Sequence, residues 1–319
     1  STLLASSAAS DVYKRQQLNL SDSEFDANSA YIKGGAISIA QTDSKAYISN
    51  STFKNNESSS SAGDGGAINI SGNSAIVEIT DSSFTGNKSG RNGGAIYNEA
   101  QLTIISDQKD TIFKDNISNS KQTTSKSNDI HNTGTLTFRG AKNTSINGGI
   151  SGSGSILKEE TGSLILKGLN SEYTGTTSIN AGKILFDKAS ADDSYLGGIT
   201  TINNGGTLEF KLAVDDALVS GAIAGTGDFL KTGAATLTLT GDNSAFTGKT
   251  TISDGKILFI SDSADDKYFA GTTEIAENKE LIYQTDIESD FSAILSGAGI
   301  LRKTGDETLN VAGAQDTFT

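Results

Sequence analysis

A block of 73 residues recurs along the second half of the chain, and this repetition limits the fold more than any other feature. Residues 152–186 (GSGSILKEETGSLILKGLNSEYTGTTSINAGKILF) recur as residues 225–259 (GTGDFLKTGAATLTLTGDNSAFTGKTTISDGKILF), and 225 − 152 = 73. A third copy begins at Gly297 and is cut off by the end of the sequence. Repeated blocks stack on one another, so the sequence predicts a fold that can be lengthened by adding blocks.

The residues inside each block predict short strands. In residues 235–240 (ATLTLT) Leu237 and Leu239 alternate with threonine, which is the two-residue period of a strand with one buried face. Apolar runs such as 163–166 (SLIL) are bracketed by Gly, Asn or Asp, which predicts turns between strands. A chain of short strands without helices can fold as a β-sandwich or as a β-solenoid. The copied blocks favour the solenoid, because the strands of a sandwich have distinct roles.

Two tetrapeptides alternate over residues 18–132. Gly-Gly-Ala-Ile occurs three times. Its two glycines and its isoleucine are Gly34, Gly35 and Ile37 in the first copy, Gly65, Gly66 and Ile68 in the second, and Gly93, Gly94 and Ile96 in the third. Phe-x-x-Asn occurs at Phe25 and Asn28, Phe53 and Asn56, Phe84 and Asn87, and Phe113 and Asn116. Residues 128–132 (NDIHN) fall where the next Gly-Gly-Ala-Ile is due, as a degenerate copy.

Each tetrapeptide suits one coil of a right-handed parallel β-helix. Paired glycines allow a turn with positive φ and a close approach of neighbouring coils, after which Ala and Ile restart a strand. We expect the Phe side chains to point inward and to stack from coil to coil. We expect each Asn to adopt the left-handed conformation at the next corner, with its amide bonded to the coils on either side as a ladder. The sequence thus predicts an all-β fold, a β-solenoid that forms a single elongated rod.

Three regions follow from these patterns. Residues 1–16 (STLLASSAASDVYKRQ) lack the solenoid pattern, and their Leu3-Leu4 pair is too short for a signal-peptide core. We interpret them as a non-native or disordered leader. Residues 17–145 are expected to form the coils with the alternating tetrapeptides, and residues 146–319 the coils of the 73-residue blocks, with the last copy truncated.

Composition removes several classes of function. The 319 residues include no Cys, Met, Trp or Pro and one His, which excludes disulfides, thiolate metal sites and cysteine catalysis. The formal net charge of −13 argues against a nucleic-acid partner, whose phosphates require Lys and Arg. Acidic residues on a Ser-, Thr-, Asn- and Gly-rich background indicate a soluble, surface-exposed protein. A chain without Cys that looks extracellular suggests one that crosses an envelope before it folds.

Several groups could carry chemistry, and each has a simpler interpretation. The pairs Asp192-Asp193, Asp215-Asp216 and Asp265-Asp266 could bind calcium or act as acid and base, but the ligand spacing of a calcium loop is absent, so solvated loops are favoured. His131 has no legible nucleophile or acid beside it, which favours a structural or surface role.

Two further patterns also favour structure over chemistry. The runs that begin at Gly152 and Gly225 look like phosphate-binding loops, but they lack the following helix and the Lys-Ser/Thr pair. The four arginines, Arg15, Arg91, Arg139 and Arg302, are scattered, which disfavours the convergent site of a polysaccharide-cleaving β-helix. We therefore expect no catalytic, cofactor-binding or metal-binding residues, no cofactor and no enzymatic activity.

The alternating tetrapeptides resemble the repeats of the polymorphic outer-membrane protein family, which are bacterial autotransporters whose passengers mediate adhesion. The long blocks resemble the autotransporter-associated β-strand repeat, whose first glycines fall at Gly152 and Gly154 and again at Gly225 and Gly227. In the second copy the further motif positions are Leu230, Lys231, Gly233, Leu237, Leu239, Gly241, Asn243, Phe246, Gly248, Thr251, Ile252, Gly255 and Leu258. The resemblance implies a secreted passenger domain of type V secretion, displayed extracellularly or on the outer-membrane surface.

The resemblance implies a passenger that acts as adhesin and stalk. We expect adhesive loops on residues 18–132 and a regular stalk in the long blocks. The expected partners are host-cell or matrix glycans or proteins, or other copies of the chain. No nucleic acid is expected, and a membrane only through a C-terminal barrel that is missing from this chain. The alternatives are a polysaccharide-degrading β-helix enzyme and a self-associating biofilm matrix protein.

Overall fold

The structure is a computed structural model that describes residues 10–11, 17–119, 126–168, 170, 172–188, 195, 197–261, 268–311 and 317–318. All the secondary structure of these residues is β-strand, and almost all strand pairs are parallel. The predicted parallel β-solenoid is confirmed. The described residues divide into two compact units, Ser1–Thr176 and Thr177–Thr319. Of the predicted leader, only Ser10–Asp11 (β1) is described, and the rest of residues 1–16 lies outside the described residues.

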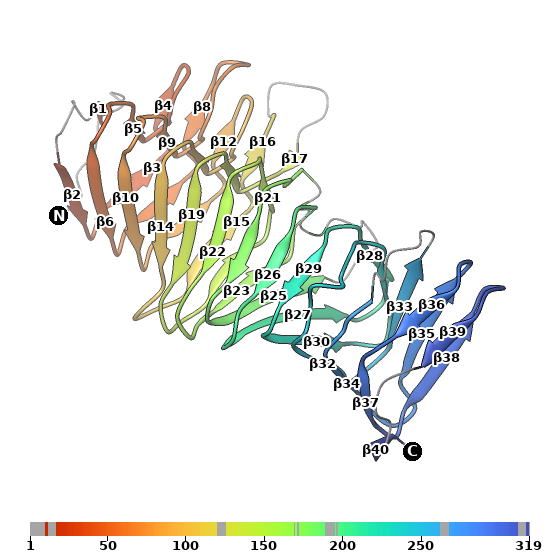
Figure 1. Cartoon of the computed structure of the whole chain (residues 1–319). Helices are drawn as coiled ribbons and strands as arrows, with labels where there is room; N and C mark the ends of the chain where they lie inside the picture. The colour runs from red at the N-terminus through yellow and green to blue at the C-terminus, as the bar shows by residue number, and fades with distance from the viewer. Residues whose placement is uncertain are drawn as a thin grey trace. The chain divides into compact units, whose positions relative to one another are not determined.

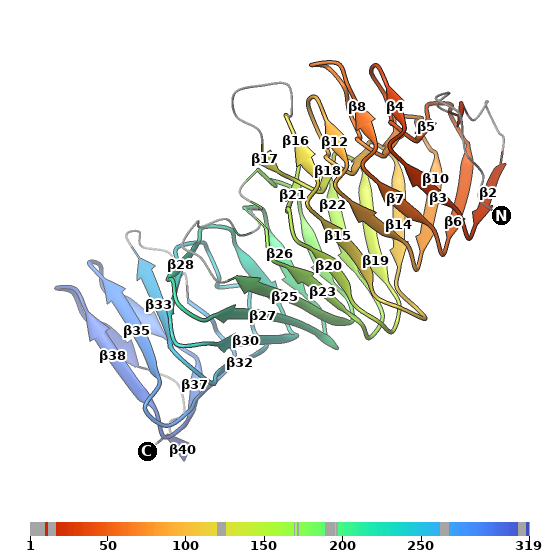
Figure 2. The same cartoon turned by 180° about the vertical axis from the view of Figure 1, so that it is seen from behind.

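The coils of unit 1 stack their strands into walls, which Figures 1 and 2 show from opposite sides. The β2 wall consists of β2 (Gln17–Ser21), β6 (Lys45–Ser49), β10 (Ile76–Thr80), β14 (Gln101–Ile105), β19 (Thr135–Arg139) and β22 (Ser155–Lys158). The β3 wall consists of β3 (Glu24–Asp26), β7 (Thr52–Lys54), β11 (Ser83–Thr85), β15 (Thr111–Lys114), β20 (Thr144–Ile146) and β23 (Ser163–Leu166). The β5 wall consists of β1, β5 (Ile37–Ile39), β9 (Ile68–Ile70), β13 (Ile96–Asn98), β18 (Ile130–Asn132) and β21 (Ile150–Ser151).

A further sheet of two-residue strands was not predicted. It consists of β4 (Ser29–Ala30), β8 (Glu57–Ser58), β12 (Lys88–Ser89), β16 (Ile117–Ser118) and β17 (Lys126–Ser127), of which β17 is antiparallel to β16. The chain beyond β4, β8 and β12 projects from the coils as a row of loops, which we call the fingers (Figure 1). The fingers therefore start with paired strands before the chain leaves the wall.

The phenylalanines stack inside unit 1 as the motif predicts. Phe25, Phe53, Phe84 and Phe113 are in register on neighbouring strands of the β3 wall. Their ring centroids lie 4.9, 4.8 and 4.6 Å apart, and the rings are nearly parallel. These distances match the spacing of about 4.8 Å between paired strands, so each coil adds one ring to the stack.

The asparagines form the predicted ladder. The Nδ2 atoms of Asn28, Asn56 and Asn87 each donate to the Oδ1 atom of the Asn in the next coil, at 2.9 Å in all three cases. In the last rung the Nδ2 of Asn116 donates to Oδ1 of Asp129 at 2.7 Å, and Oδ2 of Asp129 accepts the Gly148 N–H at 2.6 Å. The ladder therefore ends on a fully buried carboxylate.

The expected left-handed conformation of these asparagines was wrong. The positive φ angle belongs to the residue one position earlier, as in Ala27 (56°), Asn55 (54°), Gly86 (67°) and Asp115 (57°). A residue at the corner itself turns the chain there, and the following Asn then points its amide inward along the stack. The separation of the two tasks explains why the corner tolerates four different residue types while the ladder position is always Asn.

The two glycines of Gly-Gly-Ala-Ile have different tasks. The first has the predicted positive φ, which is 66° at Gly65. The second allows close approach, because a Cβ atom on Gly66 would lie 2.0 Å from the carbonyl oxygen of Gly94 in the next coil. The starts of the long blocks repeat this arrangement, with φ of 106° at Gly225 and a Cβ on Gly227 that would lie 2.4 Å from the carbonyl oxygen of Asn203.

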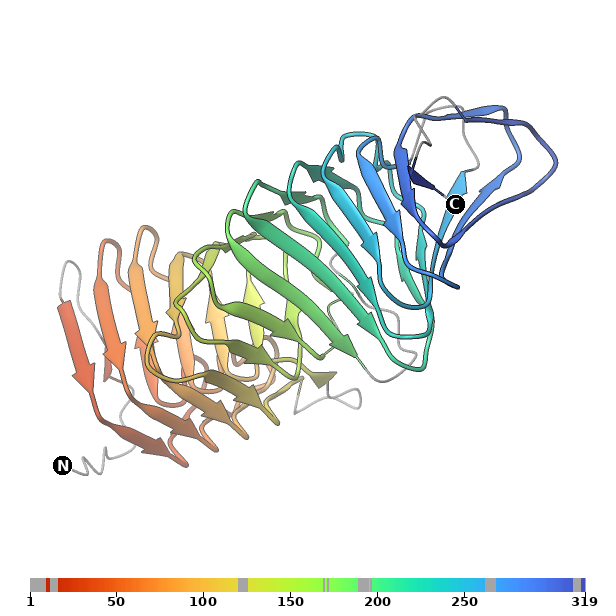
Figure 3. The same cartoon turned by 90° about the horizontal axis from the view of Figure 1, so that it is seen from below.

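The coils of unit 2 also stack their strands into walls, and Figure 3 views these coils from below. The β24 wall consists of β24 (Thr177–Ile179), β26 (Thr200–Ile202) and β29 (Ile223–Gly225). The β25 wall consists of β25 (Gly182–Lys188), β27 (Gly206–Leu212), β30 (Asp228–Thr232), β32 (Lys249–Ile252), β34 (Thr272–Ile275), β37 (Ile294–Gly297) and β40 (Thr317–Phe318). The β28 wall consists of β28 (Ala217–Val219), β31 (Thr236–Leu239), β33 (Lys256–Ser261), β35 (Glu280–Thr285) and β38 (Ile300–Thr304), and β36 (Ser289–Phe291) pairs with β39 (Leu309–Val311).

Copied strands of the long blocks do not lie on the same wall. Thr250 in β32 is the copy of Thr177 in β24, yet β24 and β32 belong to the β24 wall and the β25 wall. Likewise β33, the copy of β25, lies on the β28 wall. The reason is length. Asp228, Lys249, Thr272 and Ile294 are in register on four successive coils. Three full coils therefore need 294 − 228 = 66 residues, seven fewer than the block has. The block thus covers three coils and one additional wall, and each copy is turned by one wall around the axis.

The lysine of the repeat motif is buried at a corner. Nζ of Lys231 donates to the carbonyl oxygens of Thr232 at 2.9 Å and Gly233 at 2.6 Å. Lys158, its copy in unit 1, donates in the same way to the carbonyls of Glu159 and Glu160. Burial lowers the pKa of both ammonium groups to about 8. Each lysine thus serves as an internal cap that satisfies the carbonyls of a turn.

Truncation of one ring should reveal how strongly the phenylalanine stack supports the fold. Phe84 is fully buried between two rings, so we expect Phe84→Ala to cost about 3–5 kcal/mol of unfolding free energy through the cavity it leaves. Guanidinium denaturation measures this. The control Tyr47→Ala, on the partly exposed outer face of β6, should cost less than about 1 kcal/mol. Equal losses in both variants would contradict a dominant role of the stack.

The end of the ladder predicts a pH-dependent stability. Burial raises the pKa of Asp129 from 3.8 to about 7, so the folded chain holds a proton that the unfolded chain releases, and stability should fall as the pH rises from 4 to 7. In Asp129→Asn this contribution is absent. Denaturation midpoints of both proteins between pH 4.5 and 7.5 should therefore show a difference that changes with pH. A constant difference would show that Asp129 does not titrate in this window.

Candidate interaction surface

The repeat-motif residues themselves are closed to a ligand. Phe53, Phe84, Phe113, Asn56, Asn87 and Asn116 have no exposed surface, and Ile37, Ile68 and Ile96 are buried beside them. The second glycine of each motif is packed against the backbone of the next coil. The motifs therefore build the scaffold, and contact with other molecules falls to the side chains that the scaffold turns outward.

One outward column differs from the rest of the surface of unit 1. The residue after the motif isoleucine points away from the interior of the β5 wall, and pairing aligns Ser38, Asn69, Tyr97, His131 and Ser151 on successive coils. We call these five residues the outer column. Four of them are less than a tenth exposed, although they lie on the outer face, and His131 is partly exposed. They are therefore covered by side chains from both edges of the wall.

We call the edge of the β5 wall where its strands begin the first edge, and the edge where they end the second edge. The first edge carries an ion pair. The guanidinium of Arg91 donates through Nε to Oδ1 of Asp64 at 2.9 Å and through Nη2 to Oδ2 of the same carboxylate. The Asp64 side chain is 6% exposed and that of Arg91 is 50% exposed, so the carboxylate is buried beneath the guanidinium. A two-point contact of this kind fixes the direction of the guanidinium and leaves its other N–H groups facing outward.

The second edge carries Glu99. The Tyr97 hydroxyl donates to Oε1 of Glu99 at 2.5 Å. Burial and this hydrogen bond raise the pKa of the Tyr97 hydroxyl. The ring of Tyr97 stacks on the imidazole of His131, with centroids 5.4 Å apart and planes 4° apart. The column thus presents the edges of two parallel rings between an exposed guanidinium and an exposed carboxylate.

The structure brings a serine to His131 that sequence reasoning did not find. Nδ1 of His131 lies 2.8 Å from Oγ of Ser151, and burial lowers the pKa of the imidazole, so His131 is neutral at pH 7. The backbone N–H groups on either side of Ser151 are already used. That of Gly152 donates to the carbonyl of Glu172, and that of Ile150 donates to Oδ1 of Asn170. Neither of these two groups is therefore free to stabilise an oxyanion at Ser151.

The sequence did contain a signal for the outer column. Alignment of the Gly-Gly-Ala-Ile copies places Ser38, Asn69 and Tyr97 at one position, which is the residue after the isoleucine. Polar or aromatic residues that recur directly after a buried strand residue indicate a row of side chains that point outward. His131 joins this row through the degenerate copy, and Ser151 can be added only from the strand pairing.

Other sequence-based candidates have separate positions. Asp215-Asp216 lies in unit 2, where Oδ1 of Asp216 accepts the Thr236 N–H, whereas Asp192-Asp193 and Asp265-Asp266 lie outside the described residues, as does Arg15. Arg139 pairs with Glu159 and Arg302 pairs with Glu280, so each is held by a carboxylate of an adjacent coil. In the described part of the chain, three or more His, Asp or Glu residues do not gather in the way a metal ion requires.

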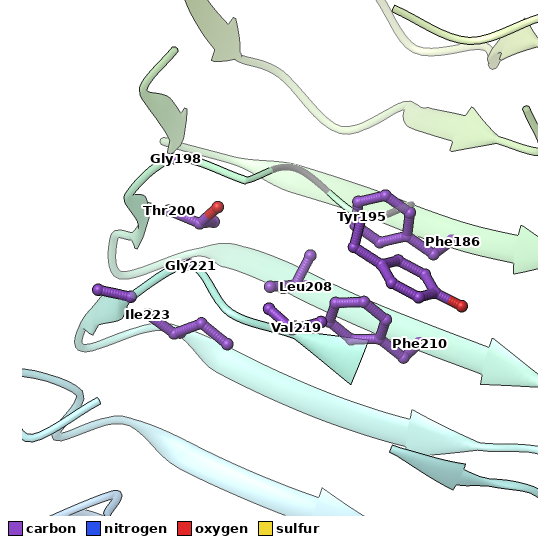
Figure 4. Close-up of a pocket in the computed structure, with 10 residues that line it drawn as sticks. Phe186, Tyr195, Gly198, Thr200, Leu208, Phe210, Val219, Gly221 and Ile223 are labelled. Carbon is purple, nitrogen blue, oxygen red and sulfur yellow. The ribbon is translucent and has the colours of Figure 1, made fainter. Parts of the chain in front are cut away.

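A small apolar gap lies inside unit 2. Phe186, Tyr195 and Phe210 surround it, together with Leu208, Val219 and Ile223 (Figure 4). The free space is about 10 Å³, at the lower limit of what one water molecule needs. It is a packing gap of the interior and offers no room for a ligand.

Comparison with protein-family models found two repeat families. The passenger-associated-transport-repeat matches residues 156–185 and 229–258, which lie within the two complete long blocks. The Chlamydia polymorphic membrane protein repeat matches residues 81–99, which contain one Phe-x-x-Asn and one Gly-Gly-Ala-Ile. Searches among curated proteins and among solved structures found no match to the chain.

The described residues contain no helix long and apolar enough to cross a bilayer. The two repeat families and the solenoid support a surface passenger domain of an outer-membrane or surface-exposed protein. As the sequence predicted, the chain carries the repeats of autotransporter passengers and resembles those of the polymorphic membrane protein kind.

Proposed function

We propose that the chain is an adhesive passenger without catalytic activity, in which unit 1 carries the contact loops and the long blocks act as a stalk. One observation supports this division above all. Successive phenylalanines of unit 1 are 28, 31 and 29 residues apart, whereas aligned residues of unit 2 such as Asp228, Lys249, Thr272 and Ile294 are 21, 23 and 22 apart. The coils between Phe25 and Phe113 in unit 1 thus contain more chain than the coils between Asp228 and Ile294 in unit 2.

The additional chain of unit 1 is displayed. It leaves the coils beyond β4, β8 and β12 as the row of fingers in Figure 1. In the first finger the side chains of Tyr31 and Ile32 are 74% and 47% exposed. Large apolar side chains at exposed loop tips are typical of protein-contact surfaces. Repetition of such loops along the coils allows many weak contacts to add up.

The two alternatives differ in what they require. A polysaccharide-degrading enzyme needs converging acidic and basic groups on one face. In unit 1 Arg91 and Arg139 are each engaged with one carboxylate on different walls. A matrix protein requires self-association, which the net charge of −13 opposes at low ionic strength.

Binding of the full chain to cells tests the proposal. The labelled 319-residue protein should bind epithelial cells or extracellular matrix, and Tyr31→Ser/Ile32→Ser in unit 1 should weaken binding at least about tenfold if the finger is a contact point. The matched control Val214→Ser/Leu218→Ser in unit 2, whose side chains are 72% and 47% exposed, should leave binding unchanged.

Three results would overturn the proposal. Loss of binding in the unit 2 variant alone would reverse the division of labour. Self-association at micromolar concentration in sedimentation, without cell binding, would establish the matrix protein. Turnover of acidic or neutral polysaccharides would establish the enzyme.

A further inference from the structure

The outer column contains an amide that the fold does not use. Asn69 has no exposed surface, and neither its Oδ1 nor its Nδ2 atom has a hydrogen-bond partner among the described residues. Leaving both groups of a buried amide unpaired is costly, and native structures rarely do so without a reason. The interior asparagines of the same unit show the contrast, because the amides of Asn56 and Asn87 bond to both neighbouring coils.

One flexible side chain links the two edges of the wall near this position. Lys33 precedes the paired glycines at the first edge of the column, and its Nζ donates to Oγ of Ser71 at 2.9 Å. Ser71 follows Ile70 at the second edge, one coil further along. The lysine therefore spans the wall between the levels of Ser38 and Asn69. Lys33 is itself exposed, and an exposed lysine–hydroxyl bond is readily exchanged for water. The Lys33 side chain can thus move aside without movement of the backbone.

The groups around the amide define the ligand. An amide offers a donor and an acceptor side by side, which is the pattern that two neighbouring hydroxyl groups complement. Arg91 adds outward N–H donors on the first edge, and Glu99 adds an acceptor on the second. Between them lie the edges of the Tyr97 and His131 rings. Hydroxyl groups and an adjacent apolar patch are the two surfaces of a sugar ring.

The charges of the site balance. Lys33 and Arg91 oppose Asp64 and Glu99, and further along the column Lys126 is paired with Glu172. Burial has the largest effect on the imidazole of His131 and lowers its pKa, with smaller electrostatic contributions from Asp64, Arg91, Glu172 and Glu99. A balanced site inside a chain with a net charge of −13 gives no advantage to a sialylated or sulfated glycan.

We propose that the outer column binds a neutral saccharide through the amide of Asn69, with the Lys33 side chain moving aside. Vicinal hydroxyl groups of the sugar bond to Oδ1 and Nδ2, and Arg91 and Glu99 hold the flanking hydroxyls. The inference rests on the proposed adhesive function and names one ligand class for unit 1.

The test uses the full chain and a panel of glycans. Immobilised neutral oligosaccharides built from galactose, glucose or mannose, and sialylated and sulfated counterparts, are probed with labelled protein, and the affinity of the best ligand is measured by titration. Asn69→Leu removes both amide groups with little change in size, so binding should weaken at least about tenfold while the melting temperature stays equal or rises, because no satisfied hydrogen bond is lost.

Two further variants separate binding from structure. Lys33→Met keeps the aliphatic stem without the ammonium, so it removes the competing bond to Ser71 and should bind the saccharide equally or a few-fold more tightly. Thr103→Val, on the outer face of β14 in the β2 wall, is the matched control and should bind as the unchanged protein does.

The outcomes are distinct. Cell binding by the unchanged protein without any neutral-glycan binding, or preference for sialylated or sulfated glycans, overturns this inference and leaves the adhesive function standing. Neutral-glycan binding that Asn69→Leu retains in full overturns the site. Absence of both cell and glycan binding overturns the proposed function together with the inference.

Discussion

The whole structure depends on the pairing of each coil with the next in parallel and in register. A coil of some twenty to thirty residues cannot bury its own apolar side, so its stability comes from the neighbouring coils. Register places equal side chains above one another, which turns single residues into continuous stacks. The rings of Phe53 and Phe84 and the amides of Asn56 and Asn87 are the clearest cases. The preference for like residues along one wall therefore follows directly from the strand spacing.

The ends of such stacks need their own solutions. An amide ladder leaves one unused group at its last rung, and unit 1 resolves this with Asp129, which takes the position of the motif alanine in the degenerate copy and accepts hydrogen bonds from both directions. Corners pose a similar problem for carbonyl groups, which Lys231 resolves by donating into the turn. In both cases an ionisable group is buried because it completes hydrogen bonds that a neutral residue would leave unpaired.

Interior features could be predicted from the sequence, and surface features largely could not. The Phe stack and the Asn ladder follow from identical residues at similar spacing, since like residues stack when coils pair. The corner conformation was misplaced by one position, because Ala27, Asn55, Gly86 and Asp115 share no residue type. The outer column was not predicted because its members differ in type, although Ser38, Asn69 and Tyr97 share the position after the motif isoleucine. The hydrogen bond from Lys33 to Ser71 joins two neighbouring coils, and no sequence pattern indicates it.

The turn of the long blocks by one wall has a consequence for evolution by duplication. A duplicated block does not repeat a decoration on the same side of the solenoid. A loop or charge at one site of a block appears in the next copy on the neighbouring wall. Successive copies of the site therefore follow a helical path around the axis. Duplication thus adds coils and places the corresponding surface groups of successive copies on different walls.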